Sequence, residues 1–285
     1  MFREETVEEL SDGKLYTAND LVRIGTNDCH GCTDCCKMGP VIVLDPLDAF
    51  ELNRFLPQRF HELAGKTVEF KVIDGLILPI LKLVPAPESV GADGSAASAG
   101  SSERTGAAAS AGSSERTGSA DAAGLADQAG SAASVGSSEP AGFTDPAEPM
   151  VCPYLGQDGR CSIHEFRPGI CRMYPLGRSW ENGDFHYILQ VNECTHCTGT
   201  KIKVKKWLGI PNLGAYEDFC RSWHGLLERV RHLLEGENPA GSFYQQVCTY
   251  LLRQFYLCDW DVDDFYTTFE ERRKDALSYL GFATL

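Results

Sequence analysis

The sequence predicts an α+β fold in which a small, irregular, cysteine-rich metal-cluster core with a short β-sheet is covered by C-terminal helices. Three observations predict this arrangement. Most of the twelve cysteines are clustered in loop-like segments rich in glycine and proline. Short apolar runs, two of them joined by a strong turn signal, lie between the clusters. The last part of the chain places its apolar residues at helical spacing.

Composition and charge exclude several classes of protein. The chain has 285 residues, with 26 Lys and Arg against 40 Asp and Glu, so its formal net charge is −14. That charge argues against a nonspecific nucleic-acid binder. The best apolar run, Leu76–Leu81, is far shorter than the ~20 residues of a membrane span. The acidic start, MFREETVEELSDGK, lacks the apolar core of a signal peptide. We therefore expect a cytoplasmic protein, in which many cysteines indicate metal or redox chemistry.

A low-complexity insert interrupts the chain between about Ala86 and Pro149. It is dominated by Ala, Gly and Ser, and the nonapeptide SAGSSERTG begins at Ser98 and again at Ser110. Such a tract cannot bury enough apolar surface to fold, so we predict a disordered surface insert over 86–149; the alternative is a docking or modification tract. The remainder then forms a discontinuous cysteine-cluster domain, 1–85 and 150–210, with a helical segment, 211–285, packing on it.

Local signals predict the elements of the first part. We expect a short helix over Thr17–Ile24 and a short β-branched strand over Val41–Leu44. Asp45 and Pro46 make a good N-cap and first position for a helix that reaches about Phe55. Val68–Val72 and Leu76–Leu83 flank Asp74-Gly75, which predicts a β-hairpin.

The second part is predicted to begin irregular and end helical. Val151–Pro175 is punctuated by Gly and Pro and should wrap around a ligand, and Asp184–Val191 should be a strand. Apolar residues from Tyr216 to Leu234 recur at i, i+3, i+4 and i+7, which predicts an amphipathic helix. Two more helices are expected, one over about Phe243–Leu257 and one that begins after the capping residues Asp261 and Asp263 and reaches about Leu280.

Nine cysteines lie in contexts typical of metal ligands. The first cluster is CHGCTDCC, the second has the spacing C-x8-C-x9-C, and the third is C-x2-C followed by Gly199. Two-residue spacing allows successive thiolates to converge on one metal. Adjacent side chains diverge, which favours two sites or one site with a reserve thiol. The nine candidate ligands are Cys29, Cys32, Cys35, Cys36, Cys152, Cys161, Cys171, Cys194 and Cys197.

The other cysteines and the nearby histidines are assigned different roles. Cys220, Cys248 and Cys258 lie within or at the end of the predicted amphipathic helices, so we expect them to be small buried apolar residues. His30, His164 and His196 lie inside the clusters, where they could bind a metal but are more typical of polar loop residues.

Basic residues surround the clusters in this acidic chain. Arg160, Arg167, Arg172 and Arg178 fall within or next to the second cluster, and Lys201, Lys203, Lys205 and Lys206 follow the third. A guanidinium group beside a thiolate stabilises the anion and lowers its pKa. We therefore expect Arg167 and Arg172, which flank Pro168 and Cys171, to contact a bound cofactor, whereas the lysines could equally be ordinary solvated charges.

The three motifs together resemble a known family. CHGCTDCC, then CPYLGQDGRCSIHEFRPGICRMYPLG, then CTGTKIKVKKWL, is similar to the YkgJ-type cysteine-cluster family, which is labelled by its CxxCxxCC signature and described as a zinc- or iron-chelating domain. The resemblance covers about Asn27 to Trp223 apart from the insert. It implies that Cys29, Cys32, Cys35, Cys36, Cys152, Cys161, Cys171 and Cys197 are the family's cysteines. Cys194 is an addition, which leaves open whether it or Cys197 is a ligand.

Three functions follow as hypotheses. The first is a metal-binding protein that holds Zn²⁺ or an iron–sulfur cluster at one or two sites, with no catalytic residue identified; soft thiolate sites suit both metals. The second comes only from the family label, since some members are called flagellin N-methylases. It is an S-adenosylmethionine-dependent lysine N-methyltransferase with a protein substrate, although no glycine-rich nucleotide-binding turn is present. The third is a metal chaperone or storage protein.

Overall fold

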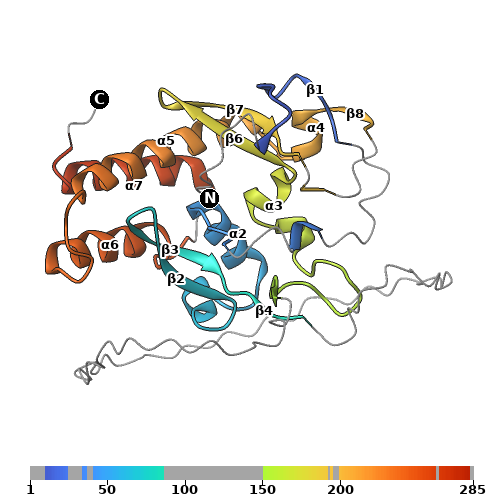
Figure 1. Ribbon diagram of the computed structural model, residues 1–285. Coiled ribbons are helices and arrows are strands. Elements are labelled where there is room, and N and C mark those ends of the chain that lie inside the picture. The colour runs from blue at the N-terminus through green and yellow to red at the C-terminus, as the bar shows by residue number, and fades with distance from the viewer. Residues whose placement is uncertain are drawn as a thin grey trace, which may run out of the picture. The chain divides into compact units, whose positions relative to one another are not determined.

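A computed structural model describes residues 10–24, 34–36, 41–86, 150–191, 193–194, 199–260 and 263–282. Within these ranges the chain has four two-stranded antiparallel sheets and six α-helices, which confirms the predicted α+β class (Figure 1). These residues belong to one compact unit built from the segments before and after residues 91–147. No helix in the described part of the chain combines the length and the apolar character needed to cross a membrane.

The helix and the hairpin predicted in the first part of the chain are confirmed. Helix α2 spans Pro46–Phe55, and Asp45 caps it through a reciprocal capping box with Asp48. Strands β2 (Val68–Ile73) and β3 (Leu76–Leu81) form the expected hairpin, in which Asp74 and Gly75 both adopt positive φ at the turn. The strand predicted over Val41–Leu44 is reduced to a single bridge between Val43 and Ile80.

The prediction of a helix over Thr17–Ile24 is wrong. Leu21–Arg23 is instead strand β1, which pairs with β8 (Lys201–Lys203). Val22 and Ile24 are fully buried whereas Leu21 and Arg23 are exposed, and this alternation has the two-residue period of a strand. Strand β8 leads directly into the short helix α4 (Val204–Leu208), which ends at Gly209 with a positive φ. Neither β8 nor α4 was predicted.

A second hairpin lies downstream of the cysteine loop. Strand β7 (Asp184–Leu189) matches the predicted strand, and its partner β6 (Leu176–Glu181) was not predicted. Asn182 and Gly183, both with positive φ, form the turn between them. A short pair, β4 (Val84–Pro85) with β5 (Met150–Val151), joins the two sides of the insert. The predicted insert 86–149 lies outside the described residues except for Ala86.

The C-terminal helices form and pack on one another as predicted. They are α5 (Leu213–Leu233), α6 (Ser242–Phe255) and α7 (Phe265–Tyr279), and α7 contacts both of the others (Figure 1). Helix α7 is capped by Asp264, whose carboxylate accepts hydrogen bonds from the Tyr266 and Thr267 amides, and not by Asp263. The other expected cap, Asp261, lies outside the described residues.

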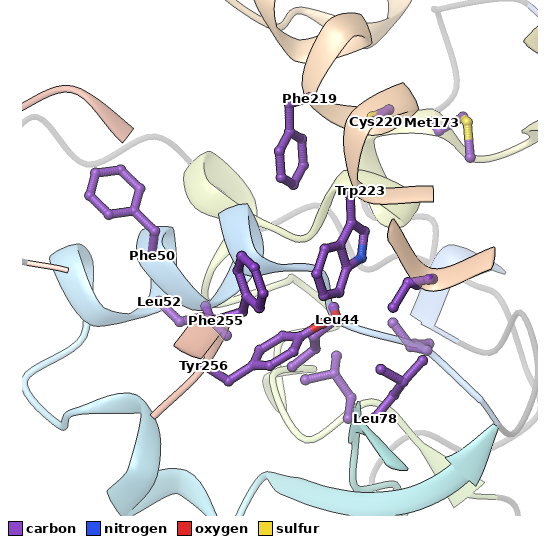
Figure 2. Close-up of a cluster of buried hydrophobic side chains, with 14 of the residues drawn as sticks. Leu44, Phe50, Leu52, Leu78, Met173, Phe219, Cys220, Trp223, Phe255 and Tyr256 are labelled. Atoms are coloured by element: carbon purple, nitrogen blue, oxygen red, sulfur yellow. Dashed lines mark hydrogen bonds between the residues drawn. The ribbon is translucent and has the colours of Figure 1, made fainter. Parts of the chain in front are cut away.

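One apolar core joins these helices to the first part of the chain. Figure 2 shows Phe219 and Trp223 of α5, Phe255 of α6, Tyr256, and Leu52 of α2 within one cluster of buried apolar side chains. The Tyr256 hydroxyl donates to the Leu44 carbonyl oxygen at 3.0 Å, so this buried phenol has a partner. The core therefore holds α2 in place, and α2 in turn contacts the cysteine loop.

Candidate functional site

Five of the predicted ligand cysteines line one pocket. Its volume is about 810 Å³, and Cys35, Cys36, Cys161, Cys171 and Cys194 all contribute to its wall. They come from three distant parts of the sequence: the 3₁₀ turn Asp34–Cys36, the loop before β6, and the segment after β7. The fold thus gathers thiols from all three cysteine clusters in one place.

A sixth predicted ligand, Cys152, is hydrogen-bonded to Cys36, which lines this pocket. Its backbone N–H donates to the Cys36 carbonyl oxygen at 3.1 Å, and the side chains of Cys36 and Cys152 are also hydrogen-bonded. The loop that follows is closed by a bridge between Leu155 and Cys161. Gly159 occupies a positive φ in the turn, a conformation that favours glycine, and the tight turn brings Cys161 back toward Cys152.

Cys171 is positioned by the short helix α3, Gly169–Met173. The first amide of this helix, from Gly169, donates to Asp48 Oδ1 at 2.8 Å, while Asp48 Oδ2 accepts from the Asp45 amide at 2.9 Å. Burial, reinforced by the charge of Asp45, raises the pKa of Asp48 well above its ordinary value. Gly169 also packs against Tyr216 so closely that a Cβ would lie 2.5 Å from the phenol oxygen. The capping box of α2 and a core tyrosine of α5 therefore fix the start of the Cys171 helix.

The two arginines expected to contact a cofactor have different positions. Arg167 lines the pocket, and its Nη1 donates to His164 Nε2 at 2.7 Å. Arg172 is not among the described lining residues, and it donates to the backbone carbonyl of Glu165. Because His164 Nε2 accepts from a guanidinium group, this nitrogen is occupied in the present arrangement. Burial, with the neighbouring Arg167 and Arg172 charges, lowers the pKa of His164.

The remaining wall of the pocket includes aromatic and basic side chains. Trp207 of α4 donates through Nε1 to the Met173 and Tyr174 carbonyl oxygens, at 3.3 and 3.1 Å, which fixes the indole beside the end of α3. Tyr174, Trp207 and Lys206 all line the pocket, as does Arg160 from the turn before Cys161. Three basic side chains, Arg160, Arg167 and Lys206, thus face the pocket against one acidic residue, Glu165.

The thiols of the site differ in their electrostatic environment. Burial raises the pKa of Cys161, and burial together with the nearby Asp48 carboxylate raises the pKa of Cys171 well above its usual range. The hydrogen bonds with Cys152 and Cys35 raise the pKa of Cys36, whereas the hydrogen bond from Cys36 lowers the pKa of Cys152. Cys152 is therefore the more acidic thiol of the Cys36–Cys152 pair.

The described residues do not form a metal site by themselves. Among them, no three His, Cys, Asp or Glu side chains are arranged closely enough to hold a metal ion. The predicted ligands Cys29, Cys32 and Cys197, and the histidines His30 and His196, lie outside the described ranges. No disulfide joins the nine described cysteines. The donor chemistry of the pocket, several thiols with basic groups beside them, fits a soft metal or a metal–sulfur cluster.

The remaining cysteines are separate from this pocket. Cys220 and Cys248 are buried in the helical core, as predicted. Cys258 is only half-buried, and its sulfur contacts the Arg272 guanidinium group. The sequence offered no signal for Asp48, Tyr174 or Trp207 as parts of the site, since each resembles an ordinary helix or loop residue until the fold brings it to the cysteine loop.

Comparisons with models of protein families, with curated proteins and with solved structures found no match to this chain.

Proposed function

We propose that this protein is a cytoplasmic metal-binding protein that holds Zn²⁺ or an iron–sulfur cluster through its clustered cysteines. The observation that carries the proposal is the convergence of Cys35, Cys36, Cys161, Cys171 and Cys194 on one pocket, with Cys152 bonded to its wall. Thiols from all three cysteine clusters share this pocket, as the ligands of one metal centre would. The likeness to the YkgJ-type cysteine-cluster family supports the same function.

The electrostatics of the pocket also support a metal–thiolate centre. Four thiolates around Zn²⁺, or around an oxidised [4Fe–4S]²⁺ cluster, carry a net charge of about −2. The guanidinium groups of Arg160 and Arg167 and the ammonium group of Lys206 would stabilise that charge. When bound, Zn²⁺ with four thiolates would cross-link the loops, and an iron–sulfur cluster would add electron transfer. Because the pKa values of Cys161 and Cys171 are raised, binding at these thiols should release protons.

One observation favours a second candidate, the S-adenosylmethionine-dependent lysine N-methyltransferase. A pocket of about 810 Å³ falls in the range of 300–1,000 Å³ that is typical of small-molecule sites. The aromatic side chains of Tyr174 and Trp207 on its wall would suit a planar organic ligand. Incubating the anaerobically purified protein with a labelled methyl donor and a lysine-rich protein substrate tests this candidate, and an absence of transfer would remove it.

The first test of the metal proposal is the composition of the protein purified without oxygen. A colourless protein with about two zinc ions per chain is the expected result if the thiols form closed zinc sites. A brown protein with broad visible absorbance, iron and acid-labile sulfide is expected if they hold a cluster. A protein free of both metals, which also fails to take up either one under reducing conditions, would refute the proposal.

Three alanine variants test the assignment of the ligands. Cys35→Ala and Cys171→Ala should lower the metal content per chain, because both side chains line the pocket. Cys248→Ala is the matched control, since this thiol is buried in α6 and is not among the described residues that line the pocket. An equal loss of metal from all three variants would overturn the assignment.

A further inference from the structure

A dense group of basic side chains lies beside the cysteine pocket. Arg23 of β1, Lys201 and Lys203 of β8, and Lys205 and Lys206 of α4 are all exposed. We call these five residues the basic face. Figure 1 shows β1, β8 and α4 as neighbours, and the Lys205 amide donates to the Ala18 carbonyl oxygen, which ties α4 to the segment before β1.

The basic face is not neutralised by the described part of the protein. None of its five side chains forms an ion pair with a described acidic residue, although the whole chain carries a net charge of −14. The carboxylate of Asp20 borders the face but accepts hydrogen bonds from the Thr17 amide and hydroxyl, both at 2.7 Å. Positive charge is therefore concentrated here in an acidic protein.

The arrangement of these charges destabilises the two-stranded sheet of β1 and β8, which we call the ribbon. Arg23 lies directly opposite Lys201 in the β1–β8 register, and like charges at directly opposite positions destabilise a sheet. An acidic residue at either position would remove the repulsion and add an attraction. A pair of residues that opposes folding is typical of a functional surface.

The ribbon also presents this charge in a fixed position next to the pocket. The other side of the ribbon is anchored, because Val22 is fully buried and Ile202 packs against the core. Lys206 of the basic face also lines the cysteine pocket, so the basic face borders this pocket through α4. Leu21, which is 54% exposed and opposite Lys203, adds an apolar side chain among the charges.

We infer that the basic face docks an acidic segment of a partner protein beside the cysteine pocket. A protein segment fits better than a nucleic acid. A continuous polyphosphate would be repelled by the acidic remainder of the chain, whereas a short run of carboxylates with an apolar residue complements the five cations and Leu21. The docking stands on the surface charges alone, and only its placement beside a metal centre rests on the proposed function.

The test measures binding of a fluorescein-labelled oligoglutamate peptide to the full-length protein by fluorescence anisotropy. Binding should weaken with added salt, and Lys203→Glu/Lys205→Glu should reduce the affinity by roughly tenfold or more. Lys66→Glu/Lys274→Glu is the matched control, because both lysines are exposed, lie outside the basic face and change the net charge equally. Absence of binding, or equal weakening in both variants, would overturn the inference.

Two further measurements separate this inference from its alternatives. Tighter binding of a single-stranded DNA oligonucleotide than of the peptide, lost in the same variant, would overturn the assignment to a protein partner. Cys171→Ala should lose metal yet retain peptide binding, which would support docking independently of the metal. Loss of peptide binding in Lys203→Glu/Lys205→Glu with unchanged metal content would likewise place the effect on the basic face.

Discussion

The replacement Gly169→Ala tests how the cysteine pocket is attached to the core. A Cβ at this position would lie 2.5 Å from the Tyr216 hydroxyl oxygen and 3.5 Å from its Cζ. Tyr216 is only 2% exposed, and its hydroxyl accepts a hydrogen bond of 2.6 Å from Arg178 Nη2. Because the ring is buried and hydrogen-bonded, the added methyl group must displace either the ring or the start of α3.

The size of the effect follows from these contacts. Forcing an extra methyl group into a packed interior costs about 1–3 kcal/mol. If the displacement also breaks the Arg178–Tyr216 hydrogen bond, which involves a charged donor, a further loss of about 1.5–3 kcal/mol follows. We therefore expect Gly169→Ala to lower the free energy of unfolding by about 1–3 kcal/mol with the bond intact, and by more without it.

Urea denaturation followed by far-ultraviolet circular dichroism measures this loss. Gly225→Ala is the matched control, because Gly225 lies within α5, a Cβ added there would meet no atom within 4 Å, and alanine should stabilise the helix by about 0.4–1 kcal/mol. Tyr216→Phe removes the obstructing oxygen, so the double variant with Gly169→Ala should lose less stability than the two single changes combined. Wild-type stability of Gly169→Ala, or strict additivity in this cycle, would refute the reasoning.

Three other predictions concern separate parts of the molecule. Lys201→Glu places a carboxylate opposite Arg23 and should raise the free energy of unfolding by about 0.2–1 kcal/mol in urea denaturation; a decrease would contradict the β1–β8 register. Asp264→Ala should destabilise α7 by about 0.5–2 kcal/mol, whereas Asp263→Ala should have almost no effect, and the reverse order would refute the assigned cap. The His224 imidazole stacks on the Trp180 indole with 3.7 Å between the ring centroids, and burial lowers the pKa of His224. As the pH falls, this imidazole is therefore protonated at a higher pH in the unfolded chain than in the folded chain. Stability should therefore fall as the pH drops below about 6.5, and His224→Gln should flatten that part of the profile; an unchanged slope would exclude His224 as its source.

Local sequence signals predicted the elements whose cause is local. The capping pair Asp45 and Pro46 begins α2, and the Asp74-Gly75 turn forms the first hairpin. The prediction failed at Leu21–Arg23, where three residues are too few to distinguish a strand from a helical turn. What makes this segment a strand is its pairing with Lys201–Lys203, about 180 residues away. No local window contains that partner.

In the candidate site, too, local sequence predicted some features, whereas others depend on contacts between distant residues. Cysteine spacing and the surrounding Gly and Pro predicted that the thiols gather, and six of the nine candidates lie at or against one pocket. The side chains that set its geometry carried no such signal. Asp48 sits inside an ordinary capping box, and Trp207 lies on a short basic helix. Their roles arise only because the fold brings α2 and α4 to the two ends of α3.

The contacts of α3 allow an experiment to distinguish loss of the proposed metal from loss of folding. Cys171 faces the pocket, while Gly169, two residues earlier, contacts Asp48 and the buried Tyr216. Removing the thiol should lower metal content while those core contacts remain, whereas Gly169→Ala should disturb the core and, through α3, move Cys171 as well. Metal loss in Gly169→Ala that is reversed by Tyr216→Phe would then trace the effect to the position of the helix, since glycine has no donor side chain and Tyr216 is not among the described residues that line the pocket. The core tyrosine would in that case control the pocket through one glycine.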